Sequence, residues 1–92
     1  MPGGLVETTT SKEILEMLSD KALNKTEYYR SKCKEFEEKY GIDFISFKKK
    51  VEESEQESFE EWDDLIEWEG YEHVYREKKK KYEELKIAWE KF

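Results

Sequence analysis

His73 and Cys33 are the only histidine and the only cysteine of the chain, so metal binding or nucleophilic catalysis would depend on them. His73 follows Glu69 and Glu72, and imidazole and carboxylate groups are common metal ligands. The di-iron sites of helical bundles, however, have a glutamate three residues before the histidine, and Gly70 occupies that position. We therefore expect no metal and no other cofactor, with His73 at a surface or an interface.

Cys33 lacks the surroundings of a catalytic thiol. No family signature of a cysteine nucleophile flanks it, and nothing in the sequence places His73 beside it. Cys33 falls on an apolar stripe, where a buried small hydrophobic side chain is the expected role. Glycine-rich phosphate loops and serine nucleophile elbows are absent, and the many carboxylates of long charged helices come without a pocket. The sequence therefore predicts a protein that is not an enzyme.

An acidic segment rich in aromatic residues is the strongest functional signal. From Glu52 to Tyr75 the chain carries eleven carboxylates and no lysine or arginine. The same segment holds five large aromatic side chains: Phe59, Trp62, Trp68, Tyr71 and Tyr75. Carboxylates attract a positively charged surface over long range, and rigid rings bury much area at little entropic cost. This combination predicts binding to a basic protein.

Eight residues of this segment form the candidate partner-binding set. Its six carboxylates would meet basic side chains, and its two tryptophans would anchor the contact. The set is Glu60, Glu61, Trp62, Asp63, Asp64, Glu67, Trp68 and Glu69.

Charge compensation within the chain is the alternative role for the acidic segment. In an antiparallel hairpin this segment would lie beside the basic residues of the first helix, which are Lys25, Arg30, Lys32, Lys34 and Lys39. The lysines at 78–81 would likewise lie toward Glu13, Glu16 and Asp20. Opposite charges in this arrangement would set the antiparallel register. Both roles can hold on different faces of one helix.

The lysines at 78–81 are the only candidate phosphate-binding patch. Four successive residues spread around a helix instead of facing one way, which favours a solvated helix surface. The net charge of −7 also disfavours nucleic-acid binding, which depends on a clustered basic surface. We therefore expect no nucleic-acid partner.

The composition is typical of a small soluble domain. Ninety-two residues with 36% apolar and 45% charged side chains leave material for one small core, and 15% aromatic content argues against disorder. No run of about 18 apolar residues could cross a bilayer. Residues 1–10 lack the basic start and apolar stretch of a secretory signal, and a single cysteine suits a reducing compartment. These features predict a cytoplasmic protein with no membrane contact.

Local signals divide the chain into a mobile arm at 1–9 and a single helical domain at 10–92. The arm contains two glycines, a proline and two threonines of a longer threonine run. Thr10 and Glu13 then have the spacing of a capping box, which predicts a first helix at about 11–40.

Two further helices are predicted by their capping residues. Gly41 follows the last apolar residue of the first helix and suits a left-handed C-cap. Asp43 is a suitable N-cap for a short helix at about 44–53. Ser58, with a glutamate three residues later, repeats the capping-box spacing and predicts a long helix at about 59–90.

These elements predict an all-α fold, a long antiparallel helical hairpin with a short intervening helix. Trp68, Tyr75, Tyr82 and Trp89 recur every seven residues on the third helix, as in a coiled-coil seam. A hairpin alone would leave this aromatic surface exposed to water. We therefore expect the chain to assemble into a helical bundle, as a homo-oligomer or by docking onto another protein.

Two short stretches resemble a known family. They are the residues from Lys39 to Phe47, Lys-Tyr-Gly-Ile-Asp-Phe-Ile-Ser-Phe, and those from Asp64 to Glu69, Asp-Leu-Ile-Glu-Trp-Glu. They resemble small helical antitoxins encoded beside TumE-like ribonuclease toxins in archaea and bacteria. In such antitoxins a long helix ends at a Tyr-Gly turn, a short helix with paired phenylalanines follows, and a second long helix carries a Glu-Trp-Glu segment. The similarity covers roughly residues 28–85.

The resemblance implies an antitoxin that neutralises a basic ribonuclease toxin by occupying its RNA-binding surface. It also implies that the carboxylates of the candidate partner-binding set replace RNA phosphates, while Trp62 and Trp68 anchor the toxin. The alternative is a homo-oligomeric helical scaffold with no enzymatic activity, whose acidic segment only balances the first helix. A neighbouring gene for a small basic protein would favour the antitoxin.

Overall fold

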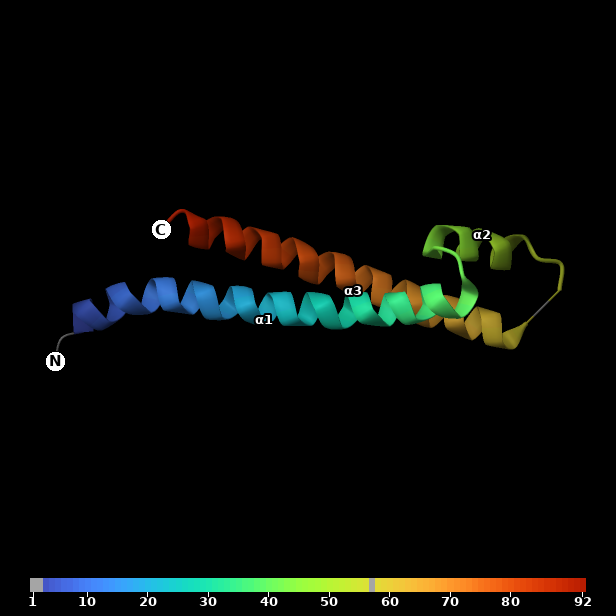
Figure 1. Ribbon diagram of the computed structural model, residues 1–92, viewed down its shortest axis with the longest axis horizontal. Coiled ribbons are helices and arrows are strands. Elements are labelled where there is room, and N and C mark those ends of the chain that lie inside the picture. Colours follow the sequence, from blue (N-terminus) through green and yellow to red (C-terminus); the bar gives the residue numbers. More distant parts are fainter. Residues whose placement is uncertain (1–2, 57) are drawn as a thin grey trace.

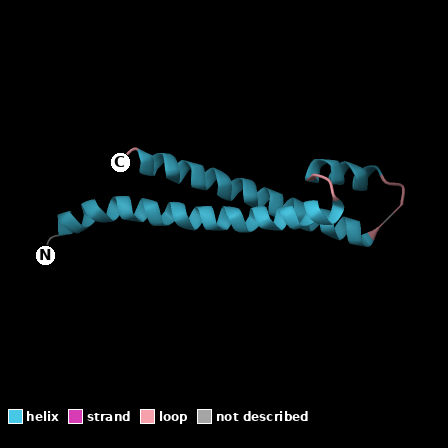
Figure 2. Cartoon of the chain, viewed as in Figure 1, coloured by secondary structure: helices cyan, strands magenta, loops and turns pink. Residues whose placement is uncertain are grey.

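The computed structural model describes residues 3–56 and 58–92, which fold into three helices without a strand (Figures 1 and 2). The helices are α1 (Gly3–Tyr40), α2 (Phe44–Glu53) and α3 (Phe59–Glu90). Figure 1 shows α1 and α3 side by side and antiparallel, with α2 lying at the end where the chain reverses. The molecule is elongated, with extents of 69 × 22 × 17 Å. The predicted all-α antiparallel hairpin with a short intervening helix is confirmed.

The predicted start of the first helix is wrong, because α1 begins at Gly3. Thr10 therefore lies inside the helix and cannot be its N-cap, and seven of the nine residues assigned to an arm are helical. Residues 1–2 of that arm lie outside the described part of the chain. Extending an existing helix costs only the propensity of each added residue, since nucleation is the expensive step. Glycine and threonine thus did not stop the helix.

The turn between α1 and α2 follows its capping residues, as predicted. Gly41 has φ of 68°, a left-handed conformation, and its N–H donates to the Glu37 carbonyl oxygen at 2.8 Å. Asp43 caps α2 by accepting from the Ser46 N–H at 2.7 Å, and that backbone hydrogen bond lowers the pKa of Asp43. Ser58 likewise caps α3 by accepting from the Glu61 N–H at 3.3 Å.

The core lies where all three helices meet. Its buried members are Cys33 of α1, Phe44, Phe47 and Val51 of α2, and Leu65 and Trp68 of α3. Trp68 is 0% exposed, and its ring packs against four others whose centroids lie 5.2–6.4 Å away: Phe36, Tyr40, Phe44 and Phe47. Beyond the reach of α2 the molecule has only two layers. Apolar side chains there, including Ile14, Met17 and Leu18, stay exposed.

No helix in the described residues is long and apolar enough to cross a membrane.

Candidate protein-binding surface on α3

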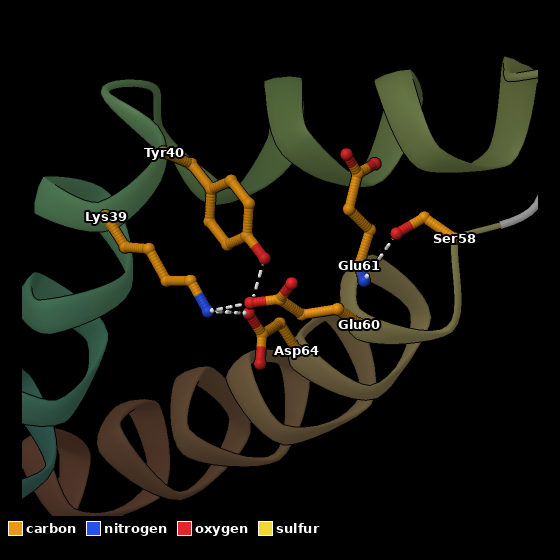
Figure 3. Close-up of polar contacts among 6 residues, drawn as sticks. All are labelled: Lys39, Tyr40, Ser58, Glu60, Glu61 and Asp64. Atoms are coloured by element: carbon orange, nitrogen blue, oxygen red, sulfur yellow. Dashed lines mark hydrogen bonds and ion pairs between the residues drawn. The ribbon is translucent and has the colours of Figure 1, made fainter.

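The first turns of α3 are joined to the end of α1 by a half-buried carboxylate. Asp64 accepts hydrogen bonds from Lys39 Nζ at 2.7 Å and from the Tyr40 hydroxyl, and Glu60 accepts from the same Lys39 at 2.9 Å (Figure 3). Burial acts to raise the pKa of Asp64, but the bonds from Lys39 and Tyr40 outweigh it and lower that pKa. Burial and the bond to Asp64 raise the pKa of Tyr40 to about 12.

Two further carboxylates of α3 pair with lysines of α2. Glu61 lies 3.9 Å from Lys50 Nζ, and Glu69 lies 3.3 Å from Lys48 Nζ. The sequence analysis did not predict these α2 lysines as partners. The run of three lysines at 48–50, directly before the acidic segment, is the sequence feature that could have indicated them. Four of the six candidate carboxylates therefore have cationic partners within the chain. The internal-compensation alternative expected these partners on the first helix, which holds for the pairs of Lys39 but not for the two carboxylates that pair with α2.

Trp68 does not belong to a partner-binding surface, so its assignment to the candidate set is wrong. Its side chain is 0% exposed at the centre of the aromatic cluster, where a partner cannot reach it without unfolding the core. Trp62 and Trp68 are six residues apart, a rotation of about 240° on an α-helix, so the two rings cannot share a face. Trp62 is 39% exposed and remains available.

The remaining members of the set lie on one outward strip of α3. Asp63 and Glu67 are exposed and flank Trp62, and two apolar residues outside the predicted set complete the strip. Phe59 is 81% exposed and Ile66 is 68% exposed. Steps of three and four residues place these side chains on one side of the helix. We call this strip the outer face of α3, with members Phe59, Trp62, Asp63, Ile66 and Glu67.

The charges of the outer face are largely uncompensated. Among the described residues no cation lies within ion-pair distance of Asp63 or Glu67, and the Tyr71 hydroxyl donates to Glu67 at 3.5 Å. The face therefore joins three exposed apolar side chains to two free carboxylates. Rings at the centre and charges at the rim are typical of protein interfaces.

Gly70 follows the outer face and has no role in the packing of its own chain. A Cβ atom added there would meet no atom of the described residues within 4 Å. Glycine inside a helix costs about 1 kcal/mol relative to alanine, so this position gives up stability without an internal reason. No other element of the described residues comes close to this position.

The lysines at 78–81 form no ion pair with Glu13, Glu16 or Asp20 within the described residues, although Lys78 and Asp20 line the same groove. Lys78 and Lys81 also line a groove with Lys21 and Lys25, over the apolar side chains of Leu18, Ala22 and Leu85. The contact of Tyr29 with Tyr71 shows the register of the two antiparallel helices. It places residues 20–29 of α1 at the same level as residues from about 71 to 80 of α3. The result is a cluster of four lysines with one nearby carboxylate, that of Asp20.

Cys33 and His73, the two candidates for catalysis or metal binding, do not lie in a site of either kind within the described residues. Cys33 is 0% exposed, which confirms its predicted burial, and burial with the nearby Glu72 raises the thiol pKa to about 12. His73 lies on the surface, with Nε2 at 3.1 Å from Glu77. No group of three or more metal-ligating side chains gathers in the part of the chain that the structure describes.

We expect Cys33 to be chemically silent in the folded protein. A thiol with a pKa of about 12 is almost entirely protonated at pH 8, and its burial keeps a reagent out. Reaction with a thiol-specific disulfide reagent should therefore proceed only after urea is added. Cys33→Ser should modestly lower the melting temperature and leave partner binding intact. Fast labelling of the native protein would assign Cys33 to a reactive site.

Comparisons of this chain with protein-family models, curated proteins and solved structures found no match.

Proposed function

We propose that this protein is a binding module that captures a basic protein through the outer face of α3. The observation that carries the proposal is the exposure of Phe59, Trp62 and Ile66 on one side of a helix. The neighbouring carboxylates, Asp63 and Glu67, form no ion pair with any described cation. A folded chain of 92 residues gains nothing by leaving three such side chains in water, whereas a partner's apolar groove would cover them. A basic rim on that groove would satisfy the two carboxylates.

The specific form of this proposal is an antitoxin that blocks a basic ribonuclease. The resemblance to small helical antitoxins supports it, as does the free acidic charge at an exposed aromatic surface. Asp63 and Glu67 would occupy positions that RNA phosphates take on the toxin, and Trp62 would stack where a base stacks. Glu60, Glu61, Asp64 and Glu69 contribute less in this form, because lysines of α1 and α2 already neutralise them.

The second candidate function is a homo-oligomeric scaffold. The exposed Ile14, Met17 and Leu18 on the two-layered half of the hairpin favour it, since a further layer of helices would bury them. A scaffold needs no basic partner. Ribonuclease inhibition therefore separates the two functions.

Removing the two free charges should slow capture of the partner. Asp63→Asn with Glu67→Gln removes long-range attraction, so association with a small basic protein encoded beside this chain should slow several-fold at low salt and depend less on salt. Trp62→Ala should instead speed dissociation, by an amount corresponding to about 1 kcal/mol for a partly exposed anchor. Surface plasmon resonance at several salt concentrations measures both effects.

The matched control is Glu83→Gln with Glu84→Gln, which removes equal charge from exposed positions far along α3. This variant should bind nearly as the wild type does. An equal decrease in association rate in both double variants would mean that total charge, and not the outer face, attracts the partner. A neighbouring basic ribonuclease that keeps full activity in excess of the wild-type chain would reject the antitoxin function.

A further inference from the structure

A second stripe on α3 shares Phe59, Asp63 and Glu67 with the outer face, continues into the C-terminal half of the helix and has an ordered arrangement of charge. Steps of three and four residues connect its members, so they share one side of the helix. The stripe consists of Phe59, Asp63, Glu67, Gly70, Val74, Lys78, Lys81 and Leu85. Its first half is acidic and its second half is basic. The two residues at its centre have small side chains, and the residues at its two ends are apolar. We call it the α3 stripe.

α1 borders the basic half of the α3 stripe, where Lys78, Lys81 and Leu85 line a groove with it, whereas the acidic half of the stripe is exposed. The residues of α3 that contact α2, Glu61 and Glu69 among them, lie on the opposite side of the helix, and those that contact α1, such as Asp64, lie between the two. Asp63, Glu67, Gly70 and Lys81 are exposed, and Val74 and Lys78 are half-buried. Neither Lys78 nor Lys81 has an ion pair within the described residues, and both stand among other lysines.

The members of the α3 stripe are symmetric about Glu72. Phe59 and Leu85 lie thirteen residues before and after it, Asp63 and Lys81 lie nine residues away, and Gly70 and Val74 lie two residues away. Glu67 and Lys78 match within one residue. A helix with this symmetry is complementary to an antiparallel copy of itself, because every acidic position then faces a basic one and every apolar position faces an apolar or small one.

We propose that a second copy of this chain docks on the α3 stripe, with the two α3 helices antiparallel and a twofold axis near Glu72. Asp63 and Glu67 of each copy then meet Lys81 and Lys78 of the other, which relieves the repulsion within the lysine cluster. Phe59 meets the second copy's Leu85 at both ends. At the centre Val74 packs into the space that Gly70 leaves open in the other helix, which accounts for a glycine with no internal role.

This assembly is closed and forms a bundle. A twofold axis perpendicular to two antiparallel helices leaves the α1 helices of both copies on the same side of the α3 pair, so four long helices pack together. The exposed ion pairs set register more than they add affinity, since surface pairs contribute little. Self-association goes beyond the proposed capture of a basic partner, but it uses the same Asp63 and Glu67. The two interactions therefore compete.

Charge reversal tests the pairing directly. One variant carries Asp63→Lys and Glu67→Lys, which makes the stripe basic throughout, and the other carries Lys78→Glu and Lys81→Glu, which makes it acidic throughout. Analytical ultracentrifugation of the wild type at micromolar concentration should show a dimer, and each variant alone should associate at least roughly tenfold more weakly. An equimolar mixture of the two should form a heterodimer. A monomeric wild type, or a mixture that stays monomeric while both variants are folded by circular dichroism, would overturn the proposal.

Gly70→Leu tests the close approach at the axis without weakening the monomer. Leucine favours the helix more than glycine, and an added Cβ meets no atom of this chain, so thermal stability measured at high dilution should rise or stay constant. The dimer should nevertheless be lost, because the new side chain fills the space that Val74 of the second copy needs. Dimerisation of this variant as strong as that of the wild type would contradict the proposed contact.

Discussion

Trp68→Ala is expected to destabilise the protein by about 3–5 kcal/mol, the range for removing a large buried aromatic side chain. The ring is 0% exposed and is the one side chain of α3 that contacts aromatic residues of both α1 and α2 among the ring contacts of the described residues. Loss of the Trp68 ring would leave a cavity between the surrounding rings of α1 and α2. These rings cannot close the cavity, because the two helices hold them apart. A small domain has only about 5–15 kcal/mol of stability, so urea unfolding followed by circular dichroism should show a large shift.

Trp62→Ala and Trp68→Phe are the matched controls for this experiment. Trp62 is 39% exposed on the outer face, so its removal should change the free energy of unfolding by well under half as much. Trp68→Phe keeps an aromatic ring, and the buried Trp68 indole N–H has no hydrogen-bond acceptor among the described residues, so this variant should cost less than alanine. Equal effects of Trp62→Ala and Trp68→Ala on stability would contradict the observed packing of α3.

Asp64→Ala is expected to cost about 2 kcal/mol of stability, because it leaves the half-buried Tyr40 hydroxyl without its acceptor and removes the partner of Lys39. This carboxylate joins the last turn of α1 to the first turns of α3 at the closed end of the hairpin (Figure 3). Asp64→Asn keeps an oxygen for the Tyr40 hydroxyl and should cost less. Chemical unfolding of both variants, together with Tyr40→Phe and the double variant Tyr40→Phe with Asp64→Ala, measures the coupling between Tyr40 and Asp64.

The contribution of Asp64 should depend on pH in a defined direction. The pKa of Asp64 is lower in the folded protein than in the unfolded chain. Its contribution to folding stability is therefore fully present above the unfolded pKa of about 4, and it is lost as the pH falls through the folded pKa. Tyr40 behaves oppositely: its folded pKa is raised to about 12, so its contribution is lost as pH rises above about 10. The stability difference between wild type and Asp64→Asn should therefore be constant near neutral pH and shrink below pH 4. A difference that stays constant down to pH 2 would contradict the bonding seen at Asp64.

Local sequence signals determined most helix ends, because capping is local chemistry. Gly41 can adopt positive φ at no steric cost, while Asp43 and Ser58 carry side-chain oxygens that satisfy free N–H groups three residues ahead. These residues act the same way wherever the helices pack, so the starts of α2 and α3 and the end of α1 followed from the sequence. The start of α1 did not, because glycine and threonine lower helix propensity without blocking the extension of a helix that is already formed.

The candidate surface depended on tertiary structure, because composition alone does not say which side of a helix is covered. Trp62 and Trp68 are the same residue type in the same acidic segment, and only the packing of α1 and α2 against α3 put Trp68 in the core and left Trp62 outside. The same packing gave Glu61 and Glu69 lysine partners on α2 and brought Lys39 of α1 to Asp64 of α3. The sequence by itself determined that this chain is helical, acidic and rich in aromatic residues. Only the contact of three helices decided which carboxylates hold the fold together and which stay free, because compensation requires a cation within a few ångströms and that distance is set by packing.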